Sequence, residues 1–107
     1  MTIELNKALF EKNVNTKFLL CDANGEHALD LIELKSGNIS PMYESFSLLF
    51  RGDGGTVHEQ RTYLMKHATV GEFDLFLTPV GRSEQGTFYE AVFNQLVERL
   101  NQEKRDG

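Results

Sequence analysis

The sequence predicts a mainly β fold, a small antiparallel barrel or sandwich of about six strands with short N-terminal and C-terminal helices. Short apolar or alternating segments recur along the chain, and turn-forming residues separate them at intervals of about 8–15 residues. These strands do not alternate with long helical segments, which argues against a parallel α/β sheet. The chain has 107 residues, of which 40 % are hydrophobic and 25 % charged. We therefore expect one globular domain, 1–107, with its core over about 5–94.

The first element is predicted to be a short helix that ends at the Asn-Val-Asn sequence of residues 13–15. Residues at helical spacing define the face that would contact the core, and a threonine precedes them as a possible N-cap. These residues are Thr2 as the cap, Glu4 near the positive end of the helix, and Leu5, Ala8, Leu9 and Lys12 on one face.

Residues 16–22 and 27–35 are predicted to form a β-hairpin. The Asn-Gly dipeptide between them favours a type I′ turn, because both residues tolerate positive φ. Alternation in the second strand suits an antiparallel sheet with one face in water. It directs Leu29 and Leu31 to one side and Asp30 to the other, and Ile32 interrupts the pattern.

A break at residues 36–41, marked by Pro41, precedes an apolar strand that starts at Tyr43. The strand stops at residues 52–55, which are rich in glycine. They lack the following Lys-Ser or Lys-Thr of a phosphate loop, so a turn is the better interpretation. The triplet Arg51-Gly52-Asp53 matches an integrin-binding sequence, but three residues recur by chance and no export signal is seen.

The second half of the chain repeats this pattern of strands and turns. The predicted core is Phe-rich, and a final amphipathic helix is indicated by the spacing of Leu96, Val97 and Leu100. The elements are a hairpin of 61–67 and 72–80 around 68–71, a polar loop at 81–86, a strand at 87–93 and a helical extension at about 94–103. The predicted core comprises Phe46, Leu48, Phe50, Tyr63, Phe73, Leu75, Leu77, Tyr89, Val92 and Phe93.

Side chains that carry chemistry do not form a recognisable motif, so we assign no catalytic, cofactor-binding or metal-binding residue and expect no enzyme. Cys21 is the only cysteine, which excludes an intrachain disulfide; we expect it to pack as a small hydrophobe. No serine lies in a Gly-x-Ser-x-Gly elbow. Six carboxylates are candidates for paired acid/base roles, and most of them are expected at the polar, outward-facing positions of strands. The sequence does not place two of them in one cleft. They are Asp22, Asp30, Glu33, Glu44, Asp74 and Glu90.

The three histidines are His27, His58 and His67, and none stands in an HxH or HExxH spacing. The nearest approach to a metal signal is His-Glu-Gln at 58–60, whose remaining ligands would have to come from unrelated positions. His67, just before a turn, is interpreted as a solvated or turn-capping imidazole.

The net charge of −5 and the scattered basic residues argue against nucleic acid as a partner. No segment has the length of an apolar membrane span, so we expect no membrane partner. The first residues lack the continuous apolar region of a secretory signal, and we expect a cytoplasmic location.

Three segments, FSLLFRG (46–52), TYLMKH…GEFDLFLTPVG (62–81) and YEAVFN (89–94), together resemble a family of small bacterial domains of unknown function. The resemblance covers roughly residues 5–94. Arg61 and Asn15 stand at positions where that family usually has glycine, so the resemblance does not predict the conformation of the turns at these two positions. Such domains are often encoded beside phage-tail-collar-like proteins, so the resemblance implies a structural or accessory role in a tail-derived or fibre-like assembly. It implies no catalytic residues.

Two functional hypotheses follow. The first is a protein interaction or assembly module, with a protein partner or a second copy of the chain (a possible homodimer), because the strands are unusually apolar for a chain of this size. The alternative is a small-ligand-binding barrel or a minor enzyme, with a barrel mouth lined by Tyr43, His58, Tyr63 or His67.

Overall fold

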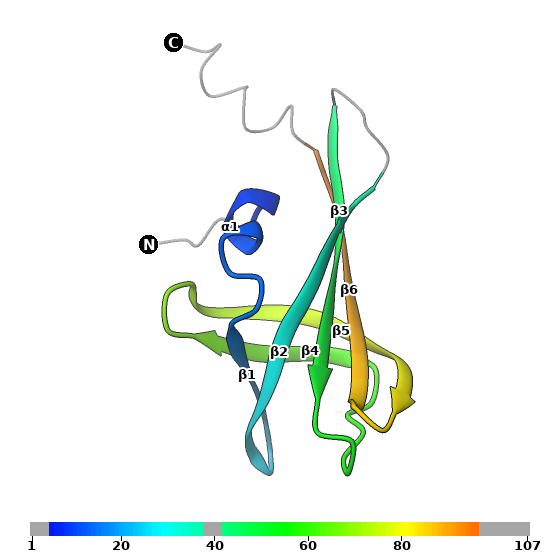
Figure 1. Ribbon diagram of the computed structural model, residues 1–107. Coiled ribbons are helices and arrows are strands. Elements are labelled where there is room, and N and C mark those ends of the chain that lie inside the picture. Colours follow the sequence, from blue (N-terminus) through cyan, green and yellow to red (C-terminus); the bar gives the residue numbers. More distant parts are fainter. Residues whose placement is uncertain (1–4, 38–41, 97–107) are drawn as a thin grey trace.

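The computed structural model describes residues 5–37 and 42–96. It confirms a mainly β domain, in which six antiparallel strands close into a barrel with the order β1-β2-β3-β6-β5-β4 (Figure 1). The elements are α1 (Lys7–Glu11), β1 (Lys17–Asp22), β2 (Gly25–Ser36), β3 (Tyr43–Gly52), β4 (Arg61–His67), β5 (Gly71–Ser83) and β6 (Gly86–Leu96). No helix in these described ranges has the length and apolar character needed to cross a membrane.

Alternation along the strands fills the barrel interior, as the sequence predicts. On β3, Phe46, Leu48 and Phe50 are at most 2 % exposed, and on β2, Leu29 and Leu31 are at most 1 % exposed. Ile32 interrupts the pattern because the pairing of β2 with β3 shifts between Leu31 and Glu33. Such a bulge adds one residue to a strand and rotates the following side chains to the other face. The rest of the predicted core is also confirmed at Tyr63, Phe73, Leu75, Leu77 and Tyr89.

The predictions for the last strand are partly wrong. Val92 is 72 % exposed, because its neighbour Ala91 occupies the inward position. Residues 94–96 continue β6 rather than starting a helix, since they pair with residues 43–45 of β3. The remainder of the predicted helix lies outside the described residues. The polar loop expected at 81–86 is instead a tight hairpin, in which Ser83 pairs with Gly86.

The β1–β2 hairpin forms where expected, but its turn is not type I′. Asp22 pairs with Gly25, and Ala23 and Asn24 connect them. Gly25 has a φ of 123°, whereas Asn24 does not have positive φ. The single positive φ therefore falls on the glycine after the two connecting residues, a pattern typical of a hairpin that ends in a bulge.

The short helix α1 plugs one end of the barrel with Phe10. Asn6 caps it by accepting a hydrogen bond from the Leu9 N–H at 2.9 Å; the expected cap, Thr2, lies outside the described residues. The predicted core face is confirmed in part, because Leu5 and Leu9 pack against the core. Ala8 and Lys12 on that face are exposed, and Phe10, which is fully buried, was not included in it. A helix of little more than one turn has no continuous apolar stripe, and a single large side chain sets its orientation.

Phe10 fills a gap between two strands that diverge. The pairing of β5 with β6 begins at Thr78, opposite Glu90, and runs toward the Ser83–Gly86 hairpin. Beyond Glu90, β6 continues beside β3 alone and rises away from β5 (Figure 1). The Phe10 ring lies 5.5 to 6.3 Å, centroid to centroid, from four rings on different strands: Phe18, Phe46, Phe73 and Phe93.

Candidate functional site

The end of the barrel opposite α1 carries polar side chains on its inner face. On β1, Phe18 and Leu20 point into the core, and Asp22, two residues further, has the same orientation. His27 on β2 stands opposite Leu20 and precedes the inward Leu29 by two residues. The hairpin therefore directs an aspartate and a histidine toward the barrel mouth, and the expectation that Asp22 faces outward is wrong.

The third residue of this cluster, His58, comes from the connection between β3 and β4. The backbone N–H of His58 donates a hydrogen bond of 2.9 Å to the hydroxyl of Tyr89, which is 1 % exposed. The hydroxyl of Tyr63 donates a bond of 2.6 Å to the carbonyl of the next residue, Glu59. Two tyrosines of the barrel wall thus fasten the connection and hold His58 over the mouth.

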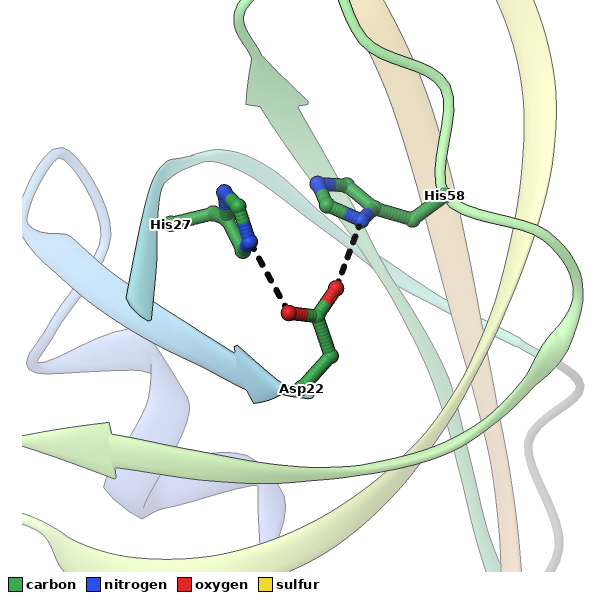
Figure 2. Close-up of side chains that lie close together, drawn as sticks. All are labelled: Asp22, His27 and His58. Atoms are coloured by element: carbon green, nitrogen blue, oxygen red, sulfur yellow. Dashed lines mark hydrogen bonds and ion pairs between the residues drawn. The ribbon is translucent and has the colours of Figure 1, made fainter. Parts of the chain in front are cut away.

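Asp22 lies between the two imidazoles (Figure 2). Its Oδ1 is 3.0 Å from Nε2 of His27, and its Oδ2 is 3.5 Å from Nδ1 of His58. The two imidazole rings are 4.5 Å apart between centroids. The side chains of Asp22 and His58 are 15 % and 9 % exposed, and that of His27 is 30 % exposed, so solvent reaches the cluster mainly beside His27.

Hydrogen bonds, neighbouring charges and burial shift the pKa values of several groups at this mouth. Burial alone would raise the pKa of Asp22, but hydrogen bonds from the Asn24 N–H and from His27, with the charges of both imidazoles, hold it below the ordinary value. Burial and the nearby His27 lower the pKa of His58, and the attraction of Asp22 offsets only part of that effect. Burial raises the pKa of the adjacent Tyr63.

The predicted mouth residues do not form one site. His58 and Tyr63 are neighbours, with ring centroids 6.1 Å apart. Tyr43 lies at the start of β3, paired with Leu96 and 45 % exposed. His67 ends β4, where its Nδ1 accepts hydrogen bonds from the backbone N–H groups of two turn residues. The interpretation of His67 as a turn-capping residue is confirmed, and His67 does not lie beside His58 and Tyr63.

The Arg-Gly-Asp triplet has a structural role in the turn, as interpreted. Nη2 of Arg51 lies 3.8 Å from Oδ2 of Asp30, and Oδ1 of Asp53 accepts a hydrogen bond from the Gly55 N–H at 3.2 Å. A Cβ on Gly52 would lie 2.5 Å from Leu29 Cδ2, so a larger residue there would have to displace the buried Leu29 side chain. Cys21 is a half-buried thiol on the outward face of β1.

A comparison with protein families assigns the chain to one of them. Residues 5–93 match the family described as Domain of unknown function (DUF6916). The chain belongs to the DUF6916 family. This confirms the resemblance to a family of small domains of unknown function, and the DUF6916 description carries no activity. No curated protein and no solved structure matches the chain.

In this DUF6916 domain the sequence pattern predicts two of the three residues at the mouth. The hairpin register predicts that Asp22 and His27 share a face with Leu20, because side chains alternate with a period of two. The spacing of His58 carries no such signal, since it lies on an irregular connection 31 residues before the Tyr89 that positions it. Within the described residues, these three side chains are the group whose ligand atoms all lie within 4.8 Å of one another.

Proposed function

We propose that the domain is a non-enzymatic assembly module that pairs with a second copy of itself through the open edge of β6. The observation that carries the proposal is the strand pairing at Ala91–Leu96. This segment pairs with β3 on one side, and the register with β5 on its other side ends at Glu90. Phe10 contacts Phe93 and Leu5 accepts a bond from the Gln95 side chain there, but among the described residues no strand takes the place of β5. A strand with one unpaired edge offers backbone N–H and C=O groups to another strand.

The composition of this edge supports the proposal. Proteins commonly protect open strand edges with charged residues, proline or a bulge. The edge of β2 beyond Leu31 carries Glu33 and Lys35. The part of β5 that pairs with β4 but not with β6 carries Glu72 and Asp74. The segment Ala91–Leu96 reads Ala-Val-Phe-Asn-Gln-Leu and carries no charge. Within residues 5–37 and 42–96 it is therefore the strand edge least protected against pairing.

A second copy fits this edge better than a charged partner does. Two identical uncharged strands can pair antiparallel about a two-fold axis, the commonest symmetry of homo-oligomers. The chain has a net charge of −5, so two copies repel each other, and a contact strip without charges avoids adding to that repulsion. On the outward face of the same strip, Val92 is 72 % exposed and supplies an apolar side chain to the contact.

The alternative of a ligand-binding barrel or a minor enzyme has less support, because apolar side chains such as Leu48 and Leu77 fill the barrel interior. The tail-related context implied by the family resemblance would suit a self-associating domain. That context is an association of neighbouring proteins and does not specify a mechanism.

The test is the solution mass of the chain, measured by size-exclusion chromatography with multi-angle light scattering over a range of concentrations. We expect a dimer for the wild-type chain. Val92→Lys should give a monomer, because it places two like charges at the two-fold contact. At a protein concentration low enough for the wild-type chain to be monomeric, both chains should unfold at similar denaturant concentrations, since Val92 is already exposed.

Val80→Lys is the matched control. Val80 is also an exposed valine on a strand, 51 % exposed, but it lies on β5 between Pro79 and Gly81, which pair with Tyr89 and Phe88 in the part of β6 that β5 covers. We expect this variant to dimerise as the wild type does. A wild-type chain that stays monomeric at every concentration would refute the proposal, as would a dimer that survives Val92→Lys.

A further inference from the structure

The geometry points to a Zn²⁺ site at the barrel mouth, with Asp22, His27 and His58 as its three protein ligands. This site lies at the end of the barrel opposite α1, whereas the β6 edge proposed for self-association lies at the α1 end (Figure 1). The two proposals therefore rest on different residues. They are tested separately.

The separations between ligand atoms fit one metal ion. Zinc binds imidazole nitrogen and carboxylate oxygen at about 2.0–2.2 Å, so tetrahedral ligand atoms lie about 3.3 Å apart. Asp22 Oδ1 and His27 Nε2 are 3.0 Å apart, and Asp22 Oδ2 and His58 Nδ1 are 3.5 Å apart. All the ligand atoms lie within 4.8 Å of one another, so the imidazoles need only a small rotation to share an ion.

The donor set selects the class of metal. Two imidazole nitrogens and one carboxylate oxygen suit zinc and related first-row ions, whereas Ca²⁺ and Mg²⁺ prefer sites built from oxygen alone. Three protein ligands leave the fourth tetrahedral position to water. In each neutral imidazole the one proton then sits on the ring nitrogen that faces away from the ion. A proton that shares the hydrogen bond with Asp22 moves there by exchange with water, so no net proton is lost and no further reactant is needed.

The structure holds these ligands in place before any ion binds. The Asn24 N–H donates a hydrogen bond of 2.8 Å to Asp22 Oδ1, which orients the carboxylate. The Tyr89 hydroxyl fixes the backbone of His58, as described above. The ring of Tyr89 also lies beside the His58 ring, with centroids 6.0 Å apart. Groups that orient ligands in this way usually raise metal affinity.

The experiment is a calorimetric titration of the full chain with Zn²⁺ near neutral pH, repeated with Co²⁺ so that visible absorption reports the coordination geometry. We expect one ion per chain, a Co²⁺ spectrum typical of four-coordination, and no uptake of Mg²⁺. His27→Gln and His58→Gln should each weaken Zn²⁺ binding by about tenfold or more, because each removes a ligand.

His67→Asn is the matched control, because it removes the third histidine of the chain from a place outside the cluster. It should bind Zn²⁺ as the wild type does, and so should Val92→Lys, even where that variant no longer dimerises. Circular dichroism checks that each variant is folded. If His58→Gln does not fold, His27→Gln decides, since its side chain is 30 % exposed. A wild-type chain without Zn²⁺ uptake refutes the site, as does equal loss of binding in His27→Gln and His67→Asn.

Discussion

Replacing His67 by alanine removes a side chain that joins the start of β1 to the β4–β5 turn. Nδ1 of His67 accepts hydrogen bonds from the N–H groups of Thr69 and Val70, at 3.0 and 3.1 Å. Nε2 lies 2.8 Å from the hydroxyl of Thr16, which donates its own proton to Asn13 O at 2.6 Å. The Thr16 oxygen must then accept, so His67 is neutral with its proton on Nε2.

The cost of His67→Ala follows from these contacts. The bond from Thr69 is exposed and water replaces it, but the bonds with Val70 and Thr16 are partly buried. Each partly buried bond contributes about 0.5–1.5 kcal/mol net, and the contact of the imidazole with the Phe18 ring adds a comparable amount. We expect His67→Ala to lower the free energy of unfolding by about 2–3 kcal/mol at neutral pH. His67→Asn should lose less, because its side-chain oxygen can accept from the same turn.

The same contacts make this cost depend on pH. Burial lowers the pKa of His67 in the folded chain. Its stabilising contribution is therefore complete above the ordinary histidine pKa of about 6.5 and is lost as the pH falls through the lower folded value. Urea unfolding at about pH 8 and about pH 5 measures this, with a change of at most about 1.4 kcal/mol per pH unit for one proton. The difference between wild type and His67→Ala should shrink in acid. A difference that is constant or grows in acid would refute the reasoning.

Two further changes test the packing of the barrel by thermal and urea unfolding. Phe10→Ala should cost about 3–5 kcal/mol, because it empties the contact between four rings, and a loss below about 1 kcal/mol would show that α1 does not plug the barrel. Gly86→Ala should lower the free energy of unfolding by more than about 2 kcal/mol, because Gly86 has a φ of 142° and an added Cβ would collide with the Gly52 carbonyl oxygen. Gly81→Ala is the control: nothing lies near its added Cβ, so the free energy of unfolding should change by less than about 0.5 kcal/mol. Similar losses from both variants would contradict the close approach of Gly86 to Gly52.

Side-chain alternation made most of the barrel predictable from the sequence. Phe46, Leu48 and Phe50 needed only their spacing to be placed in the core. Val92 and Phe93 could not both face inward, because consecutive residues on a strand point to opposite sides, and treating both as core was the error. Residues 94–96 follow a helical pattern in the sequence, yet pairing with β3 makes them a strand. A partner distant in the sequence thus overrides a local preference.

The backbone conformation of Asn15 explains how the chain tolerates a departure from the family pattern. Asn15 stands where the resembling family usually has glycine, and its φ is 69°, in the left-handed region. Asn is among the few residues that adopt this conformation at small cost, so the turn survives the replacement. The mouth cluster was harder to foresee. Two of its members follow from strand register, but His58 arrives through a connection whose course depends on the tyrosines that hold it.

The divergence of β5 from β6 has a consequence for the order of folding. The ring of Phe93 is one of the rings that surround Phe10, and the side-chain amide of Gln95 donates a hydrogen bond to Leu5 O, 90 positions earlier in the chain. During synthesis the N-terminal helix and the long strand β3 leave the ribosome without their final partners. The apolar surface around Phe10 then stays uncovered until the last described strand emerges. Closure of this core is therefore a late event, and contacts between such distant residues slow folding because a large loop must be ordered first.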